Sequence, residues 1–162
     1  MKRLDRVHKT NMSTAFRPSL HRRVLNRVMR LWIRLGLPPG KYHMLTVKGR
    51  RSGILHSTPV SVMAIEGQRW LVAPYEPKDW VKNARAVGQV TLQRAGRTEV
   101  LAVQEERDPT LCAPVLQRYV KEEPITRRFF DAKPGSPLDE FADEAHRHPV
   151  FRVLDAGGNQ PT

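Results

Sequence analysis

Two arginines and a serine stand between two glycines in the stretch Lys48–Gly53. Glycine lets the backbone turn tightly and expose its N–H groups, and each arginine adds a fixed fork of donors that suits phosphate or carboxylate. Apolar residues flank the stretch, so we expect a turn between two strands. The residues indicate a docking site for a polyanion, with Lys48, Arg50, Arg51 and Ser52 as candidate contacts. A solvated basic hairpin is the other interpretation.

Polar residues interrupt the apolar run that follows this turn and precede a proline. A proline within a strand indicates a sheet edge or a bulge, and bulges are frequent next to binding sites. Free backbone groups there could pair with the edge of a flat heterocycle, whereas a plain bulge would only bend the strand. The candidate residues are His56, Ser57, Thr58, Pro59 and Val60.

A third group surrounds the start of a short predicted helix, residues 80–86, after a proline-rich loop. Trp80 on its first turn could cover an aromatic ligand, and Asn83 lies one turn further on the same face. Tyr75 and Lys78 belong to the loop. The alternative is that Trp80 packs into the core and Asn83 bonds to local backbone.

Other chemistries have little support in the sequence. The single cysteine, Cys112, is typical of a small core residue, and the six histidines show no metal-ligand spacing, so we expect no metal site. His146 and His148, two apart before a proline, indicate a solvated helix end. Phosphate-loop, Gly-x-Gly-x-x-Gly and Gly-x-Ser-x-Gly patterns are absent.

The net charge of +12 is concentrated at the N-terminus, where residues 1–34 hold ten Lys/Arg and one acid. Such local charge suits nucleic acid, anionic lipid or an anionic ligand. A helix is predicted over 18–36, with one face of arginines and an opposite apolar stripe formed by Leu20, Val24, Val28, Leu31 and Leu35. This helix could lie on an anionic membrane, or its stripe could pack on the body of the protein or on a second subunit.

The elements expected around these residues are short strands with brief helices between them. We predict strands at 43–48, 58–65, 69–73, 90–94, 98–104 and 149–154, helices at 80–86, 109–120 and 138–146, and irregular structure over 122–137. This order predicts an α+β fold, a split antiparallel β-barrel with helices packed outside. We expect a disordered basic tail over 1–17, one domain over 18–155 and a frayed end over 156–162.

Together the three segments resemble the deazaflavin-dependent nitroreductases, a family of small split-barrel oxidoreductases that use coenzyme F420 and include quinone reductases. Its pattern is an apolar strand, Gly-Arg-(Arg/Lys)-(Ser/Thr)-Gly, a strand with a proline, and Trp-x-x-Asn-x-x-Ala. Here it corresponds to residues 45–53, Thr58-Pro59-Val60 and residues 80–86. The ending 148–152 is also similar.

The resemblance implies a role for each matching position. Arg50, Arg51 and Ser52 would hold the cofactor's phosphate and the start of its polyglutamate tail, with His56 assisting. Ser57 to Val60 would face the deazaflavin edge, and Tyr75, Lys78, Trp80 and Asn83 would line the other side. The acceptor side has no clear match, so Tyr119, Phe129 and Phe130 are candidates by residue type only.

The expected function is hydride transfer from reduced coenzyme F420, with FMN as the alternative cofactor, to an electron-poor quinone, nitro group or double bond. Tyr75 or solvent would protonate the product. The expected partners are a small or lipid-like acceptor and, through residues 18–36, anionic membrane; a homodimer is also compatible. This places the protein in the cytoplasm, at the inner face of the cell membrane if the helix binds there. A non-catalytic carrier of cofactor, haem or fatty acyl chain, and less favourably a nucleic-acid binder, are the alternatives.

Overall fold

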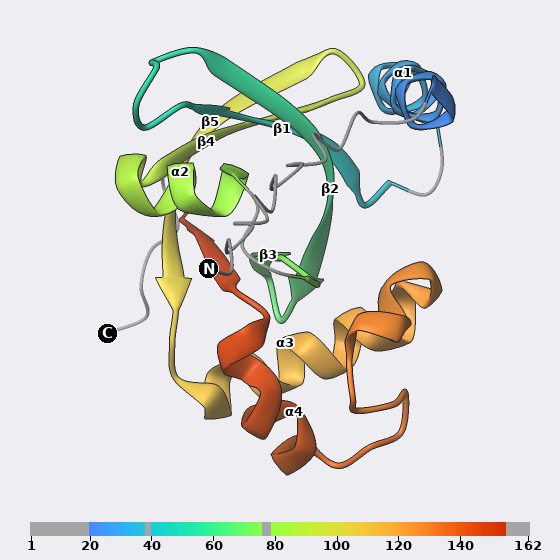
Figure 1. Ribbon diagram of the computed structural model, residues 1–162, viewed down its shortest axis with the longest axis vertical. Helices are drawn as coiled ribbons and strands as arrows, with labels where there is room; N and C mark the ends of the chain where they lie inside the picture. The colour runs from blue at the N-terminus through green and yellow to red at the C-terminus, as the bar shows by residue number, and fades with distance from the viewer. Residues whose placement is uncertain (1–19, 38–39, 76–78, 155–162) are drawn as a thin grey trace, which may run out of the picture.

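The computed structural model describes residues 20–37, 40–75 and 79–154, with side chains from residue 27 onward. The predicted basic tail over 1–17, the predicted frayed end over 156–162 and the candidate Lys78 lie outside the described residues. Within them, six antiparallel strands close into a barrel in the order β1-β2-β3-β6-β5-β4 (Figure 1). The predicted α+β barrel is therefore confirmed. The strands are β1 (Tyr42–Lys48), β2 (Leu55–Ile65), β3 (Gln68–Val72), β4 (Gln89–Arg94), β5 (Arg97–Glu106) and β6 (Val150–Leu154).

Alternation along these strands builds two apolar cores. Inward residues such as Leu45, Leu92 and Phe151 fill the barrel, and α2 (Asp79–Val87) adds Val81 and Ala84 at one of its ends. Outward residues of β2 and β3 form a second core with α3 (Pro109–Glu122), α4 (Leu138–Glu144) and the segment between them. Figure 1 shows α3 and α4 together on one side of the barrel, away from α1 (Leu20–Arg34).

The sequence located most of these elements. Asp108 caps α3 through its carboxylate, which accepts hydrogen bonds from the backbone N–H and the hydroxyl of Thr110, as expected for an Asp-Pro helix start. The region predicted as irregular contains a 3₁₀ helix, η1 (Pro124–Phe129), and a second short one, η2 (Ala145–Arg147), follows α4.

The hairpin between β4 and β5 holds the C-terminal end of α1. The Arg94 guanidinium donates to the carbonyls of Gly36 at 2.8 Å and Leu37 at 2.9 Å, which satisfies acceptors that the helix end leaves unpaired. The Ala95 N–H donates to the Ile33 carbonyl at 3.2 Å. Gly36 has φ +69°, and a Cβ there would lie 2.7 Å from the Ala95 Cβ, so the close approach requires glycine.

This anchoring sets which face of α1 meets the barrel. Ile33 is fully buried, whereas the stripe residues Val28, Leu31 and Leu35 are 53%, 58% and 63% exposed. The interpretation in which the stripe packs on the protein's own barrel is therefore wrong for these three residues. Ile33 lies on the opposite side of the helix, and it makes that contact instead.

Candidate functional site

The predicted basic turn joins β1 to β2 and is organised around Gly49. The Gly49 N–H donates to the Ile54 carbonyl at 2.8 Å, and the Gly49 carbonyl accepts from the Gly53 N–H at 2.9 Å. A Cβ at Gly49 would lie 2.7 Å from the Ser52 Oγ and 3.1 Å from the His56 Nε2. The absence of a side chain therefore lets the serine and the imidazole converge on one stretch of backbone.

One amide oxygen connects this turn to α2. The Asn83 Oδ1 accepts from the Arg50 backbone N–H at 3.1 Å and from the Arg50 Nη1 at 2.8 Å. Asn83 is only 2% exposed, so the acceptor is held in place by the packing of α2 against the barrel end. The sequence placed Arg50 and Asn83 in separate motifs, and the structure brings them together across 33 positions.

The turn keeps much of its positive charge. The side chains of Lys48 and Arg51 are exposed. The Asp79 carboxylate lies 3.8 Å from the Arg50 Nη1, but it is largely exposed, so it screens the guanidinium weakly. Because the amide of Asn83 is neutral, it orients Arg50 without cancelling its charge. The turn thus presents cations that suit an anionic group.

The first half of β2 provides an open edge beside the turn. Among the described strands, residues 55–61 pair with β1, whereas residues 62–65 pair with β3. Pro59 lies opposite Met44 of β1, in the part of β2 that has no partner in β3, so of the two predicted alternatives, an edge or a bulge, the structure favours the edge. Ser57 faces outward, with its hydroxyl 2.7 Å from that of Thr46, and its carbonyl accepts from Arg30 at 3.5 Å. Thr58, Pro59 and Val60 are half-buried.

The indole of Trp80 packs toward the end of the barrel. Its ring centroid lies 5.6 Å from that of Phe151, and both Trp80 and Val60 pack against the barrel core while remaining partly exposed. The interpretation in which Trp80 packs into the core therefore holds in part, because the ring contacts the core but remains partly exposed. Trp80 and Val60, from two predicted segments, pack on the same core.

On the other side of the predicted site, Tyr75 meets the segment that follows α3. Its ring centroid is 4.9 Å from that of Phe129, and the Arg128 guanidinium lies 4.9 Å from the Phe129 ring. Of the three acceptor-side candidates, Phe129 is exposed, whereas Tyr119 and Phe130 are buried. Burial also raises the pKa of the Tyr119 hydroxyl. Phe129 is therefore the candidate placed to meet a molecule next to Tyr75.

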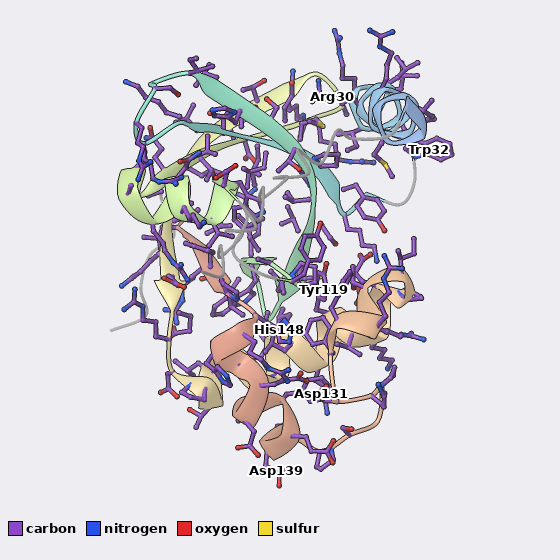
Figure 2. The ribbon with its side chains drawn as sticks, viewed as in Figure 1. Arg30, Trp32, Tyr119, Asp131, Asp139 and His148 are labelled. Carbon is purple, nitrogen blue, oxygen red and sulfur yellow. The ribbon has the colours of Figure 1, made fainter. Side chains whose placement is uncertain are left out.

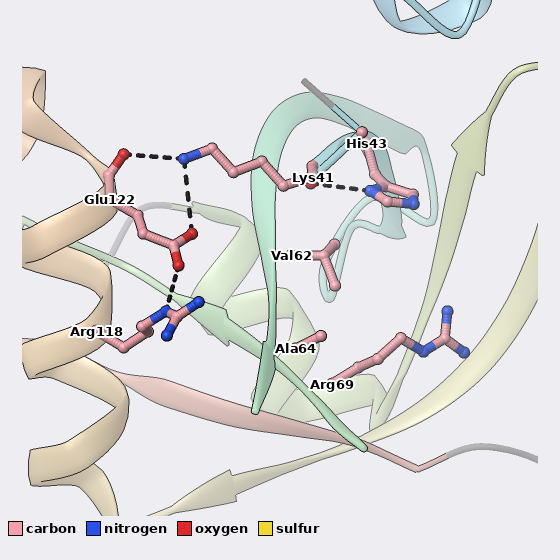
Figure 3. Close-up of a pocket in the computed structure, with 8 residues that line it drawn as sticks. Lys41, His43, Val62, Ala64, Arg69, Arg118 and Glu122 are labelled. Atoms are coloured by element: carbon pink, nitrogen blue, oxygen red, sulfur yellow. Dashed lines mark hydrogen bonds and ion pairs between the residues drawn. The ribbon is translucent and has the colours of Figure 1, made fainter. Parts of the chain in front are cut away.

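A separate hollow of about 420 Å³ opens at the far end of β1 from the basic turn (Figure 3). Its lining includes Lys41, Arg69, Arg118 and Glu122, and none of the residues predicted for the cofactor site. These cations already have carboxylate partners: Arg118 pairs with Glu122, Lys41 with Glu123 at 2.7 Å, and Arg69 with Glu99 at 2.7 Å. The hollow therefore lacks the unbalanced charge of the turn.

The prediction of a solvated helix end is wrong for one of its two histidines. His146 is exposed, as expected for a solvated helix end, but His148 is buried. Its Nε2 lies 3.3 Å from the Oε2 of Glu144, which is also buried. Burial lowers the pKa of His148, and the Glu144 carboxylate opposes that shift. The four-residue spacing of Glu144 and His148 was the available signal, because it places both on one side of a helical segment.

The barrel, with the basic turn between two of its strands, places this chain in the class of small split-barrel proteins. Solved structures of other proteins are similar to it in fold. A putative pyridoxamine 5'-phosphate oxidase from Listeria innocua is similar at 9% identity, with TM-score 0.51 over 86% of this chain and 95% of that one. A protein of unknown function from Agrobacterium tumefaciens is similar at 16% identity, with TM-score 0.52 over 81% and 55%. A chain described as a domain-swapped dimer gives 18% identity and TM-score 0.50 over 83% and 99%. At these identities, the similarity shows the fold alone.

The family follows from the sequence match. The model of the F420H(2)-dependent quinone reductase family matches residues 21–124. The chain belongs to this family, and it is an oxidoreductase that uses coenzyme F420. No curated protein matches it. The matched region includes the basic turn, the open edge of β2 and α2.

Proposed function

We propose that the protein transfers a hydride from reduced coenzyme F420 to an electron-poor acceptor, a quinone, a nitro compound or an activated double bond. The observation that carries this proposal is the pair of hydrogen bonds from Arg50 to the Asn83 side chain. These bonds bring two separate sequence motifs together at one basic surface. When bound, the reduced deazaflavin supplies the hydride. The chain's own residues bind the cofactor, orient it and exclude water.

We assign the cofactor's anionic part to the turn and its ring to the surfaces beside it. Arg50, Arg51 and Lys48 would hold phosphate and carboxylate by charge-assisted hydrogen bonds, with Ser52 and His56 beside them. The open edge of β2 and the partly exposed indole of Trp80 would border the ring. The full set we assign is Lys48, Arg50, Arg51, Ser52, His56, Ser57, Thr58, Pro59, Val60, Tyr75, Lys78, Trp80 and Asn83.

The acceptor would lie next to Tyr75 and Phe129, whose rings form an exposed aromatic pair. Aromatic faces suit a flat quinone or nitroaromatic. The Tyr75 hydroxyl is the side chain we assign to product protonation, with solvent as the other source. Tyr75→Phe should lower turnover with menadione if the hydroxyl donates the proton, and unchanged turnover would assign that step to solvent.

Replacing both arginines of the turn tests the cofactor assignment. Arg50→Ala combined with Arg51→Ala should raise the Kd for coenzyme F420 at least tenfold, which corresponds to about 1.4 kcal/mol. Arg97→Ala is the matched control, because Arg97 is exposed at the β4–β5 turn, at the other end of β1. An unchanged Kd in the double variant would reject the assignment. Parallel titration of the wild type with FMN tests the cofactor choice.

We further propose that α1 attaches the cytoplasmic protein to the inner face of the membrane, from which a lipid-like acceptor would be drawn. The exposed stripe of Val28, Leu31 and Leu35 supports this, because the same helix carries exposed arginines that suit anionic headgroups. In the described residues no helix is long and apolar enough to cross a bilayer.

Vesicle binding separates this proposal from a dimer through the same stripe. The wild type should co-sediment with phosphatidylglycerol vesicles and not with phosphatidylcholine vesicles, and Leu31→Ser with Leu35→Ser should abolish binding. Val100→Ser, an exposed apolar site on β5, is the control. A homodimer would be favoured by a different result: the wild type binds neither kind of vesicle and elutes as a dimer, and the same two substitutions make it monomeric.

A further inference from the structure

Glu144, at the end of α4, is a buried carboxylate that collects donors from two segments. Its oxygens accept from the backbone N–H groups of Asp131 at 3.0 Å and Ala132 at 3.1 Å, and from the Arg147 Nη2 at 2.9 Å. The His148 Nε2 lies 3.3 Å from the same carboxylate. Since a carboxylate only accepts, this nitrogen carries the proton that lies between them. Glu144 and His148 are each 3% exposed.

His148 connects this carboxylate to the two segments that border the acceptor side of the proposed site. Its ring stacks on Phe130, with centroids 3.9 Å apart and planes 20° apart. The carbonyl of the next residue, Pro149, accepts the Ala73 N–H at 2.9 Å. Figure 2 shows His148 between the barrel and α4.

Each of these contacts lies one or two residues from a member of the exposed aromatic pair. Phe129 precedes Phe130, which is stacked on His148, and Tyr75 follows Ala73, whose N–H donates to the carbonyl of Pro149, the residue after His148. Glu144 fixes the backbone immediately after Phe130 through its two N–H acceptor contacts. The buried Glu144–His148 pair thus contacts the segment that follows Phe129 and adjoins Pro149, which bonds to the segment that precedes Tyr75.

We propose that Glu144 and His148 are positioning residues that set the geometry of the Tyr75–Phe129 pair for the acceptor. This inference rests on the proposed function. Replacing a buried ionic group by apolar residues is often neutral or stabilising, so stability alone does not account for such a pair. A carboxylate with four hydrogen-bond partners holds the two segments at a defined position relative to each other. An apolar contact is not directional and would not do so.

Two substitutions at His148 separate its ring from its hydrogen bond. His148→Phe keeps an aromatic ring against Phe130 and removes the donor to Glu144, whereas His148→Gln keeps a donor and removes the ring. We expect the KM for menadione to rise about tenfold in His148→Phe and about threefold in His148→Gln, with kcat and the Kd for coenzyme F420 within about twofold of wild type. His146→Gln, at an exposed position in the short helix η2 that ends just before His148, should match the wild type.

A measurement without cofactor gives an independent answer. In His148→Phe, the amides of Ala73, Asp131 and Ala132 should exchange with deuterium at least about tenfold faster, while amides between β1 and β4 keep their rates. If His148→Phe does not fold, Phe130→Leu removes the stacking partner without disturbing the charges, and the same exchange pattern is expected.

The outcomes distinguish the two proposals. A wild type that binds coenzyme F420 and reduces menadione, with unchanged KM and unchanged amide exchange in the folded variants, would overturn the positioning role alone. A wild type that neither binds nor oxidises the reduced cofactor would overturn the proposed function and, with it, the acceptor role of the Tyr75–Phe129 pair.

Discussion

The oxygen of Asn83 and the carboxylate of Glu144 each gather donors from distant parts of the chain, with opposite electrostatic results. Asn83 is neutral, so it orients Arg50 and leaves the cation's charge available beside the exposed Arg51. Glu144 is buried and its carboxylate pairs with the exposed Arg147 and with the buried His148, so its charge is balanced within that region. The comparison indicates that the first region is built to receive an anion and the second to hold two segments in place.

The largest effect should come from removing the buried carboxylate. Glu144→Ala leaves two backbone N–H groups and His148 without their acceptor and leaves Arg147 with Asp131 alone, and breaking a buried ionic network typically costs about 3–5 kcal/mol. Urea denaturation should show a loss of that order in the free energy of unfolding. Asp143→Ala, at the exposed neighbouring position, should change it by less than about 0.5 kcal/mol. Similar losses for both variants would contradict the assigned role of Glu144.

Removing the neutral acceptor should have a smaller effect. Asn83→Ala leaves the Arg50 backbone N–H and one guanidinium N–H unpaired near the barrel end, at a cost of about 1–3 kcal/mol. The same denaturation experiment measures it, with Lys82→Ala as the control, because Lys82 is exposed on the same helix. A loss as large as that of Glu144→Ala would remove the distinction drawn between the two regions.

Adding charge at the same position tests the electrostatic half of the comparison. Asn83→Asp retains an acceptor for Arg50 but supplies a carboxylate, so it should neutralise the guanidinium that the cofactor's anionic part would contact. We expect the Kd for coenzyme F420 to rise about tenfold, about 1.4 kcal/mol, with less loss of stability than in Asn83→Ala. Isothermal titration measures this, and equal affinity in both Asn83 variants would show that charge is unimportant there.

The sequence reveals the turn because its residues are contiguous. Gly49, Arg50 and Ser52 lie within four positions, and alternating apolar residues on both sides locate the strands. The Arg50–Asn83 contact could not be predicted, because it depends on how α2 packs on the barrel end. The burial of His148 was not predicted for a related reason: its ring stacks on Phe130, and that contact depends on how the segment after α3 folds back.

The N-terminal helix shows the same limit. Its periodicity identified an apolar stripe, but periodicity does not say what the stripe faces. The hairpin contact through Arg94 and Ala95 decides that, and it turns Ile33 inward. The 3₁₀ helix η1 could not be predicted from the sequence either, because a short 3₁₀ turn has no clear apolar periodicity.

A methyl group at the turn should have a moderate effect. Gly49→Ala places a Cβ 2.7 Å from the Ser52 Oγ, which can rotate away, and 3.1 Å from the Ile54 carbonyl, which is backbone and moves less easily. We expect a loss of about 1–2 kcal/mol in unfolding free energy. Gly40→Ala is the control, because the nearest atom to its new Cβ would be 3.9 Å away, in the flexible Arg94 side chain. Equal stabilities would mean that Gly49 is not crowded.

The smallest expected effect is a dependence of stability on pH through His148. Burial lowers its pKa in the folded protein, Arg147 lowers it further, and Glu144 and the Pro74 carbonyl oppose the shift. Below about pH 6.5 the unfolded histidine therefore binds more protons than the folded one, so stability should fall as the pH drops through that value. In urea denaturation between about pH 7.5 and 5.5, the free energy of unfolding of His148→Gln should fall less steeply than that of the wild type.

Some decrease in the free energy of unfolding should remain, because the pKa of His43 is also lowered, mainly by burial. The double variant His43→Gln with His148→Gln should depend on pH still less. Identical pH profiles for wild type and His148→Gln would mean that the pKa of this imidazole does not change on folding, contrary to the expected lowering by burial.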